Sequence, residues 1–233
     1  MVDLFDNALK IIESNIVNFF IMFVLFIIIF FIIYGIFTII ISLTIGLFFR
    51  SLLPGFQTAL SLIILTWYIS SLGEMSKSIL NNKTVDYVNA IIKGLYNLKI
   101  NFSPVLIIAI LGFIGGFIEQ LTFGNGFLGY GLFNFSVIQG IFYLIAIGIA
   151  LSEFVGKKNG INFTHLFNKI NKISPNAGIS LYIIVLISII PIGEVLQILI
   201  MGFPVIIIIL FEMESHSHNI SHNKQNEKKQ KNM

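Results

Sequence analysis

Long stretches without a charged residue dominate the chain, and shorter stretches rich in lysine separate them. The first charge-free run lies between Glu13 and Arg50. As a continuous helix it would measure roughly 54 Å, at about 1.5 Å per residue. That length is too great for one upright span and too small for two spans joined by a turn. We therefore predict one long tilted helix over about 15–48, which either runs straight or enters along the membrane interface and bends near Gly35.

The later apolar runs extend this pattern to an all-helical, polytopic transmembrane bundle of about six spans. A helix that crosses a bilayer needs about 20 apolar residues. Turns rich in proline and glycine separate these runs, and Ser103-Pro104 predicts a helix start with the serine as its cap. The predicted spans cover about 15–48, 51–73, 104–122, 132–152, 176–191 and 195–211.

Two of the charged stretches carry apolar residues at helical spacing. Val88, Ile92 and Leu95 belong to such a stripe in the first stretch. We predict two amphipathic helices, over about 84–98 and 161–173, each of which lies in the membrane interface or against the bundle. These elements make one integral membrane domain over 1–211. The polar residues 212–233 have almost nothing to bury and predict a disordered cytoplasmic tail.

Composition excludes most classes of soluble protein. Hydrophobic residues make up 56% of the chain and charged residues only 11%, whereas soluble domains carry roughly 25% charged residues. A soluble enzyme, a disordered chain or a nucleic-acid-binding domain cannot be built from so few charges. The chain has no cysteine and no recognisable catalytic or metal-binding motif. We therefore predict a protein that is not an enzyme and has no cofactor, metal site or nucleic-acid partner.

The placement of the lysines predicts the orientation in the membrane. In a topology of six spans all lysines fall on one face, and Arg50 is the cationic residue of the other face. Cytoplasmic loops of membrane proteins carry an excess of lysine and arginine. We therefore expect a multi-pass protein of the cell membrane whose two termini and two amphipathic helices are cytoplasmic.

The lysines of the amphipathic stretches are candidate contacts for lipid headgroups. Basic residues beside a membrane attract the anionic headgroups of the cytoplasmic leaflet. The leading hypothesis is therefore a membrane scaffold that interacts with lipids or with partner proteins. The candidate contacts are Lys83, Lys93, Lys99, Lys157, Lys158, Lys169 and Lys172.

Two glutamates suggest an alternative function. Glu119 and Glu194 lie near the outer ends of two spans, at matching places in two stretches that share the same order of elements. Ionisable groups at membrane depth are costly and often line a pathway. With Gln139 and Arg50 they could form the polar pathway of a small transporter or channel. The other interpretation is that both carboxylates reach the outer headgroups and do nothing specific.

One pair of small residues predicts close helix packing. Gly112 and Gly116 are separated by three residues in an apolar run, and this spacing lets two membrane helices approach closely. The partner helix lies either within the same bundle or in a second molecule. The pair thus predicts intramolecular packing or, as an alternative, a homo-oligomer or a membrane partner protein.

The segment IALSEFVGKKNGINFTHLFNKINKISPNAGISLYIIVLISIIPIG, at 149–193, resembles the C-terminal half of a family of uncharacterised multi-pass membrane proteins, mainly archaeal and bacterial. Phe163 and Phe167 fit the amphipathic stretch of that family, and GEMSKSILNNKTVDYVNAIIKGLYN, at 73–97, is similar to its earlier counterpart. The resemblance implies a multi-pass membrane fold of unknown function. That family is distantly like the membrane domains fused to glycerophosphodiester phosphodiesterases, and the resemblance implies no catalytic residues.

Overall fold

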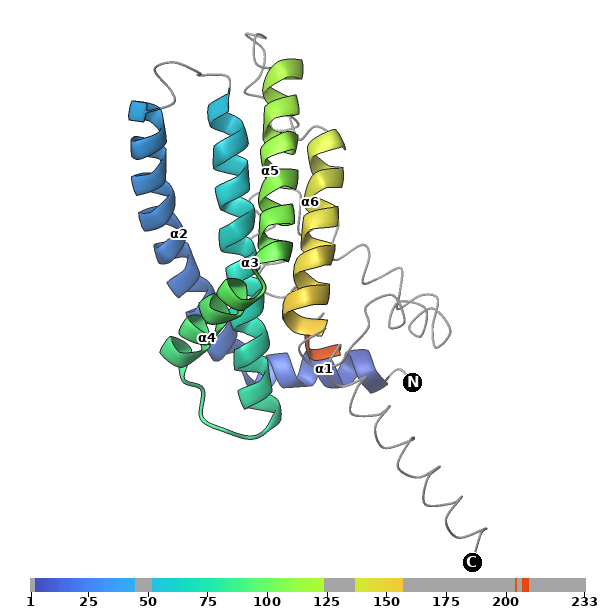
Figure 1. Cartoon of the computed structure of the whole chain (residues 1–233). Helices are drawn as coiled ribbons and strands as arrows, with labels where there is room; N and C mark the ends of the chain where they lie inside the picture. Colours follow the sequence, from blue (N-terminus) through green and yellow to red (C-terminus); the bar gives the residue numbers. More distant parts are fainter. Residues whose placement is uncertain (1–2, 45–51, 124–136, 157–203, 205–206, 210–233) are drawn as a thin grey trace, which may run out of the picture.

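A computed structural model describes residues 3–44, 52–123, 137–156, 204 and 207–209 (Figure 1). Every regular element in these ranges is helical, which confirms the predicted all-helical class for this part of the chain. The elements are α1 (Asp3–Ser14), α2 (Ile16–Thr44), α3 (Leu53–Leu80), α4 (Tyr87–Ile100), α5 (Phe102–Phe123), α6 (Val137–Ala150) and the short π-helix η2 (Leu151–Gly156).

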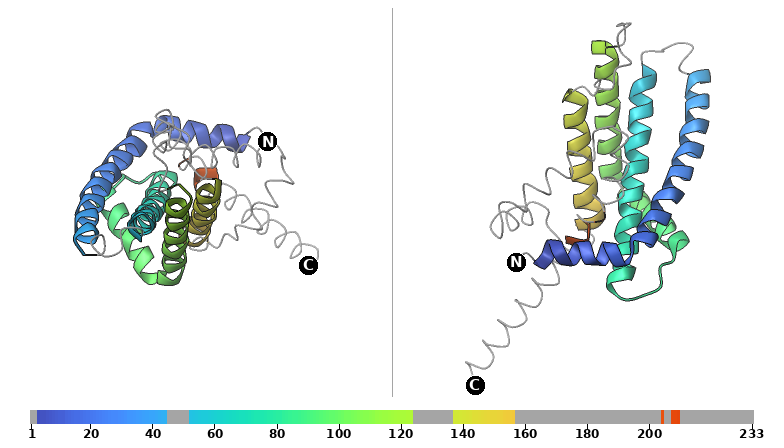
Figure 2. Two further views of the ribbon diagram at one scale, coloured as in Figure 1. Left: turned by 90° about the horizontal axis from the view of Figure 1, so that it is seen from above. Right: turned by 180° about the vertical axis from the view of Figure 1, so that it is seen from behind.

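Four helices stand side by side, and two lie across one end of the group. α2, α3, α5 and α6 form the upright group, whereas α1 and α4 cross its lower end (Figures 1 and 2). α2 and α3 are each long and apolar enough to cross a membrane. α4 and α5 meet at a bend of 88° and make a third candidate span if they are counted together. The described residues thus contain two or three helices that could span a membrane.

The six predicted spans are described only in part. α3 and α5 cover the predicted spans 51–73 and 104–122, and α6 lies inside 132–152. α5 begins at Phe102, so Ser103-Pro104 lies in its first turn and Ser103 is not its cap. Proline is tolerated there because the first turn of a helix has no intrahelical partner for its backbone N–H groups. Apart from 204 and 207–209, the predictions over 161–173, 176–191, 195–211 and 212–233 lie outside the described residues.

A break at Asn15 separates α1 from α2, so the helix predicted over about 15–48 begins, as α2, at Ile16. The Asn15 backbone N–H donates to the Ile12 carbonyl at 3.0 Å, and its side-chain Nδ2 donates to the Ile11 carbonyl at 2.9 Å. Side chains of asparagine compete with the backbone for such bonds and interrupt helices. The helix after the break is continuous through Gly35. The helix before the break, α1, instead lies across the bundle (Figure 2).

α3 is the centre of the bundle. It packs against α2, α4, α5, α6 and η2. Leu62, Ile69, Leu72 and Met75 of α3 are fully buried, and Met22 of α2 joins them in the same core. The other described helices are arranged around α3, so the position of each polar group on α3 decides what it can contact.

The small residues of α5 face α3. A Cβ atom added to Gly112 would lie 2.8 Å from the Cα atom of Ala59, and one added to Gly116 would lie 2.6 Å from the carbonyl oxygen of Pro54. These distances leave no room for a side chain without movement of the backbone. The structure therefore places Gly112 and Gly116 at a contact within the chain, where they let α3 and α5 approach closely.

Candidate functional site at the charged end of the bundle

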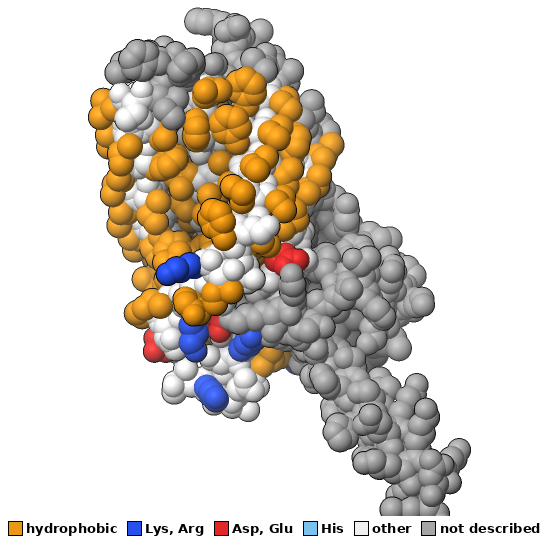
Figure 3. All heavy atoms as spheres, viewed as in Figure 1, with side chains coloured by type: hydrophobic (Ala, Val, Ile, Leu, Met, Phe, Trp, Pro, Cys, Tyr) orange, Lys and Arg blue, Asp and Glu red, His pale blue; other side chains and the backbone are white. Residues whose placement is uncertain are grey.

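The charged side chains that the structure describes gather at one end of the molecule. They belong to α1, the C-terminal end of α3, the turn that follows it, α4 and η2, whereas apolar side chains cover the upright helices (Figure 3). These charged residues are Lys10, Glu13, Glu74, Lys77, Lys83, Asp86, Lys93, Lys99 and Glu153.

The turn between α3 and α4 is built by asparagine and aspartate. Asn82 adopts a left-handed backbone conformation with a φ of 52°, which asparagine tolerates better than most residues. Asp86 then caps α4, because its Oδ1 accepts a hydrogen bond from the Asn89 backbone N–H at 3.0 Å. Sequence reasoning missed this cap, although an aspartate directly before an apolar-periodic run is a typical signal for one.

α4 docks on α3 through small and polar residues. Gly94 lies so close to Ser71 that a Cβ atom on it would collide with the Ser71 hydroxyl. Trp67 Nε1 donates a hydrogen bond to the Ile91 carbonyl at 2.9 Å. Asn97 is buried in the same contact. α4 is therefore fixed against α3 by close backbone approach and by directional bonds.

Asn97 joins the two helices through a polar network. Its Nδ2 donates to Ser70 Oγ at 3.2 Å and to Glu74 Oε1 at 3.4 Å. The Glu74 carboxylate also lies 3.9 Å from the Lys77 ammonium. A carboxylate that is largely buried needs such partners, because burial without them is costly. Glu74 is therefore held by groups of the protein itself.

The apolar stripe predicted on this helix is divided between two surroundings. Leu98 is buried against the bundle, but Val88, Ile92 and Leu95 are exposed, Val88 to 66%. The small residues Ala90 and Gly94 occupy the buried face instead. α4 thus packs against the bundle on one face and presents an apolar surface outward on another.

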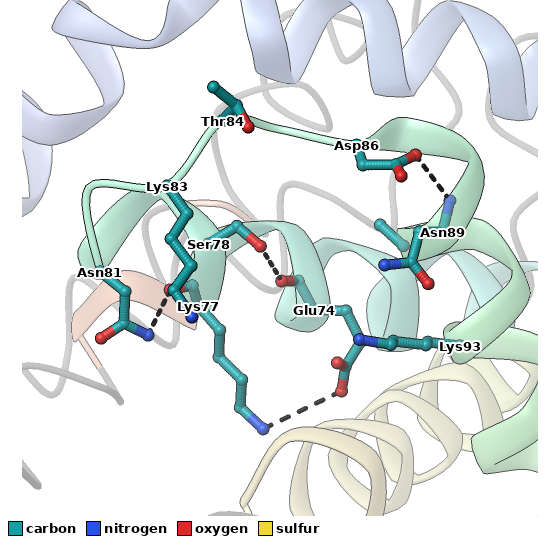
Figure 4. Close-up of a pocket in the computed structure, with 10 residues that line it drawn as sticks. Glu74, Lys77, Ser78, Asn81, Lys83, Thr84, Asp86, Asn89 and Lys93 are labelled. Carbon is teal, nitrogen blue, oxygen red and sulfur yellow. Dashed lines mark hydrogen bonds and ion pairs between the residues drawn. The ribbon is translucent and has the colours of Figure 1, made fainter.

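A polar pocket of about 640 Å³ lies between the end of α3, the turn and α4 (Figure 4). Lys83 from the turn and Lys93 from α4 are exposed, and no ion pair of either appears among the described residues. The two carboxylates of the pocket, Glu74 and Asp86, already accept bonds from protein donors. The lining residues are Glu74, Lys77, Ser78, Asn81, Lys83, Thr84, Asp86, Asn89, Ala90 and Lys93.

This arrangement is suited to an anion. Three lysines and two carboxylates line the pocket, so its side chains carry a net charge of +1, and Lys83 and Lys93 are the exposed cations. Ammonium groups bind phosphate and carboxylate oxygens through charge-assisted hydrogen bonds. Within the described ranges, no group of three or more His, Cys, Asp or Glu residues could hold a metal ion.

The predicted polar site residues differ in how much of them the structure describes. Lys83, Lys93 and Lys99 lie at the charged end, and the first two line the pocket. Glu119 lies in α5 and Gln139 in α6, but their side chains are not among those described, so the polar pathway stays a prediction. The residues that lie outside the described part of the chain are Arg50, Lys157, Lys158, Lys169, Lys172 and Glu194.

Comparison with known proteins adds no relative. No family model matches the chain, and neither a curated protein nor a solved structure matches it. The family resemblance drawn from 149–193 therefore stays a prediction, and function is inferred from the residues of the charged end.

Proposed function

We propose that this chain is an integral membrane protein without enzymatic activity that binds anionic lipid headgroups at the cytoplasmic face. The observation that carries the proposal is the gathering of Lys77, Lys83, Lys93 and Lys99 at the end of the bundle that α1 and α4 cross (Figures 1 and 3). A cluster of lysines at one end of an apolar bundle is typical of the cytoplasmic side. Anionic lipids of that leaflet are attracted to such clusters.

The exposed faces of α4 support the same proposal. Ile92 and Tyr96 point outward beside Lys99, and all three are exposed. A helix of this kind lies with its apolar face among the acyl chains and its lysines at the headgroups. The long lysine side chain lets Lys99 cover apolar surface while its ammonium reaches the polar layer. α4 would thus hold the lysines at headgroup level.

Fluorescence of Trp67 tests the proposal, because it is the only tryptophan of the chain. The full chain is reconstituted into bilayers that contain phosphatidylglycerol or phosphatidylcholine with brominated acyl chains, which quench tryptophan on contact. We expect brominated phosphatidylglycerol to quench Trp67 more strongly at the same mole fraction. The apparent preference should be at least about fivefold, the factor that corresponds to about 1 kcal/mol, the contribution of a single lysine near an anionic surface.

Salt supplies the control for this measurement. Attraction between exposed charges falls as the Debye length shortens, to about 3 Å at 1 M salt. The preference for phosphatidylglycerol should therefore shrink in high salt, whereas quenching by phosphatidylcholine should not change. Equal quenching by both lipids at low salt would contradict the proposed function.

A further inference from the structure

We propose that the pocket between α3 and α4 binds the phosphate of a single anionic glycerophospholipid headgroup. This inference rests on the proposed function and deepens it, since it replaces a diffuse basic surface by one site. Lys83, Lys77 and Lys93 extend into the pocket from the turn, from α3 and from α4 (Figure 4). Three cations on different elements can surround a phosphate in a way that lysines along a single helix face cannot.

The balance of charge in the pocket favours an anion. Lys77 lies 3.9 Å from Glu74, which neutralises part of its charge. Asp86 is used as the cap of α4. Glu74 and Asp86 keep their negative charges, so the three lysines leave the lining with a net charge of +1, and Lys83 and Lys93 are the exposed cations that can reach a ligand. A phosphodiester carries one negative charge and two unesterified oxygens, so each ammonium can donate to one oxygen.

Neutral polar groups complete the lining. Thr84 and Asn89 are exposed at the pocket, and Asn81 donates its Nδ2 to the Lys77 carbonyl, which leaves its side-chain oxygen toward solvent. Hydroxyl and amide groups of this kind can donate to, or accept from, the hydroxyl groups of a headgroup. The volume of about 640 Å³ leaves space for more than the phosphate itself.

The position of the pocket favours a lipid over a soluble phosphate. Asn89 and Lys93 line the pocket, while Val88 and Ile92, their neighbours on α4, are exposed and apolar. A headgroup in the pocket therefore has an apolar surface directly beside it for its acyl chains. A soluble phosphate would make no use of that surface.

The test measures saturable binding of short-chain phosphatidylglycerol to the full chain in detergent micelles by calorimetry. We expect one site. Lys83→Gln and Lys93→Gln should each weaken binding about tenfold, because each removes one charge-assisted hydrogen bond. Lys10→Gln is the control: Lys10 is an exposed lysine of α1 that does not line the pocket, and its loss should change binding less than about twofold.

Asp86→Asn supplies an independent variant. Asparagine caps helices as well as aspartate does, so α4 should remain in place. Removal of the carboxylate should tighten binding of the anionic lipid about threefold, because a like charge close to the phosphate is lost. If the pocket bound a cation instead, removal of the Asp86 carboxylate would lower its affinity for that cation. Circular dichroism and size-exclusion profiles equal to those of the unsubstituted chain establish that each variant is folded.

Three outcomes would overturn the inference. If Lys10→Gln weakens binding as much as Lys93→Gln, the lysines act as a diffuse surface, and only the proposed function survives. If inorganic phosphate displaces the lipid at the lipid's own concentration, the site is one for a soluble anion. If Asp86→Asn weakens binding, the pocket does not recognise an anion. Failure of the proposed function is distinguished by the bilayer quenching experiment, in which no preference for phosphatidylglycerol would be seen.

Discussion

α2 and α3 are both long enough to cross a membrane, but they are buried to very different extents. Over the most apolar 18 residues of each helix, 22% are buried in α2 and 61% are buried in α3. α2 has no charged residue, whereas α3 contains Glu74 and Lys77 and several hydroxyl side chains. In a water-soluble protein the more apolar segment is the more buried one. The reversed order is what is expected of a helix whose outer surface faces hydrocarbon.

The difference also shows what holds helices together in such surroundings. Hydrocarbon is as apolar as leucine, so apolar surface alone does not drive two helices together. α3 has small and polar residues at its contacts, for example Ser70 opposite Asn97 and Ala59 opposite Gly112. α2 packs mainly through its first turns, where Asn18 Oδ1 accepts a hydrogen bond from the Tyr87 hydroxyl at 2.6 Å. Small and hydrogen-bonding residues, more than hydropathy, therefore determine which helix becomes central.

The largest effect is expected when a charge is placed on the outer face of α2. Phe31 lies in the middle of α2 and is 70% exposed. Phe31→Lys should make membrane insertion of this helix about 3 kcal/mol less favourable, the cost of a lysine at the centre of a span. The measurement is the fraction of newly made chain that inserts into microsomes or proteoliposomes.

A lysine at the charged end provides the control for that variant. Asn89 is exposed on α4, so Asn89→Lys adds the same charge where lysines already lie. It should insert as well as the unsubstituted chain. Equal insertion of Phe31→Lys and Asn89→Lys would mean that the outer face of α2 is bathed in water, and the contrast between α2 and α3 would lose its explanation.

A smaller effect is expected from glycine substitutions that compare the two helices directly. Gly112→Ala brings a methyl group within 2.8 Å of the α3 backbone and should lower the free energy of unfolding by about 2 kcal/mol. Gly35 on α2 has nothing within 4 Å of an added Cβ atom. Gly35→Ala should therefore be neutral or stabilise by up to about 1 kcal/mol, since alanine favours the helix.

Thermal unfolding of both glycine variants in the same detergent makes this comparison. The melting temperature of Gly112→Ala should fall clearly below that of the unsubstituted chain, and that of Gly35→Ala should not. A loss of similar size in both variants would show that α2 is packed as tightly as α3. The opposite order would place the close helix contact at Gly35 and not at Gly112.

The sequence predicted those features that depend on neighbouring residues. Uncharged runs predicted helices over most of α2, α3 and α5, because a span of about 20 apolar residues is recognisable without its partners. The topology of six spans predicted that Lys83, Lys93 and Lys99 share one face. The helix α1, which ends before Asn15, was not predicted, since its separation from α2 depends on whether one side chain bonds to the backbone of the preceding turn.

The pocket could not have been predicted, because its walls come from separate elements. Glu74 lies in α3, Lys83 in the turn and Lys93 in α4, and only the docking of α4 on α3 brings them together. That docking depends on Gly94 and Asn97, which are weak signals in a sequence. The apolar stripe of α4 predicted a helix in the membrane interface or against the bundle, but not that Ala90, Gly94 and Leu98 would be buried while the other large apolar residues remain outside.

The smallest expected effect concerns the bond that ties α4 to α3. Trp67→Phe removes the hydrogen bond from Nε1 to the Ile91 carbonyl but keeps an aromatic ring against Phe26, whose ring centroid lies 5.3 Å away. We expect a loss of about 1 kcal/mol, the net contribution of one neutral hydrogen bond. Hydrogen exchange should accelerate in α4 about fivefold and remain unchanged in α2, because α2 does not depend on this bond.

Tyr96→Phe, which removes an exposed hydroxyl from α4, is the control and should leave exchange unchanged. Unaltered exchange of α4 in Trp67→Phe would show that this bond adds nothing to the docking of α4, which would then depend on close packing at Gly94 and on the bonds of Asn97 to α3.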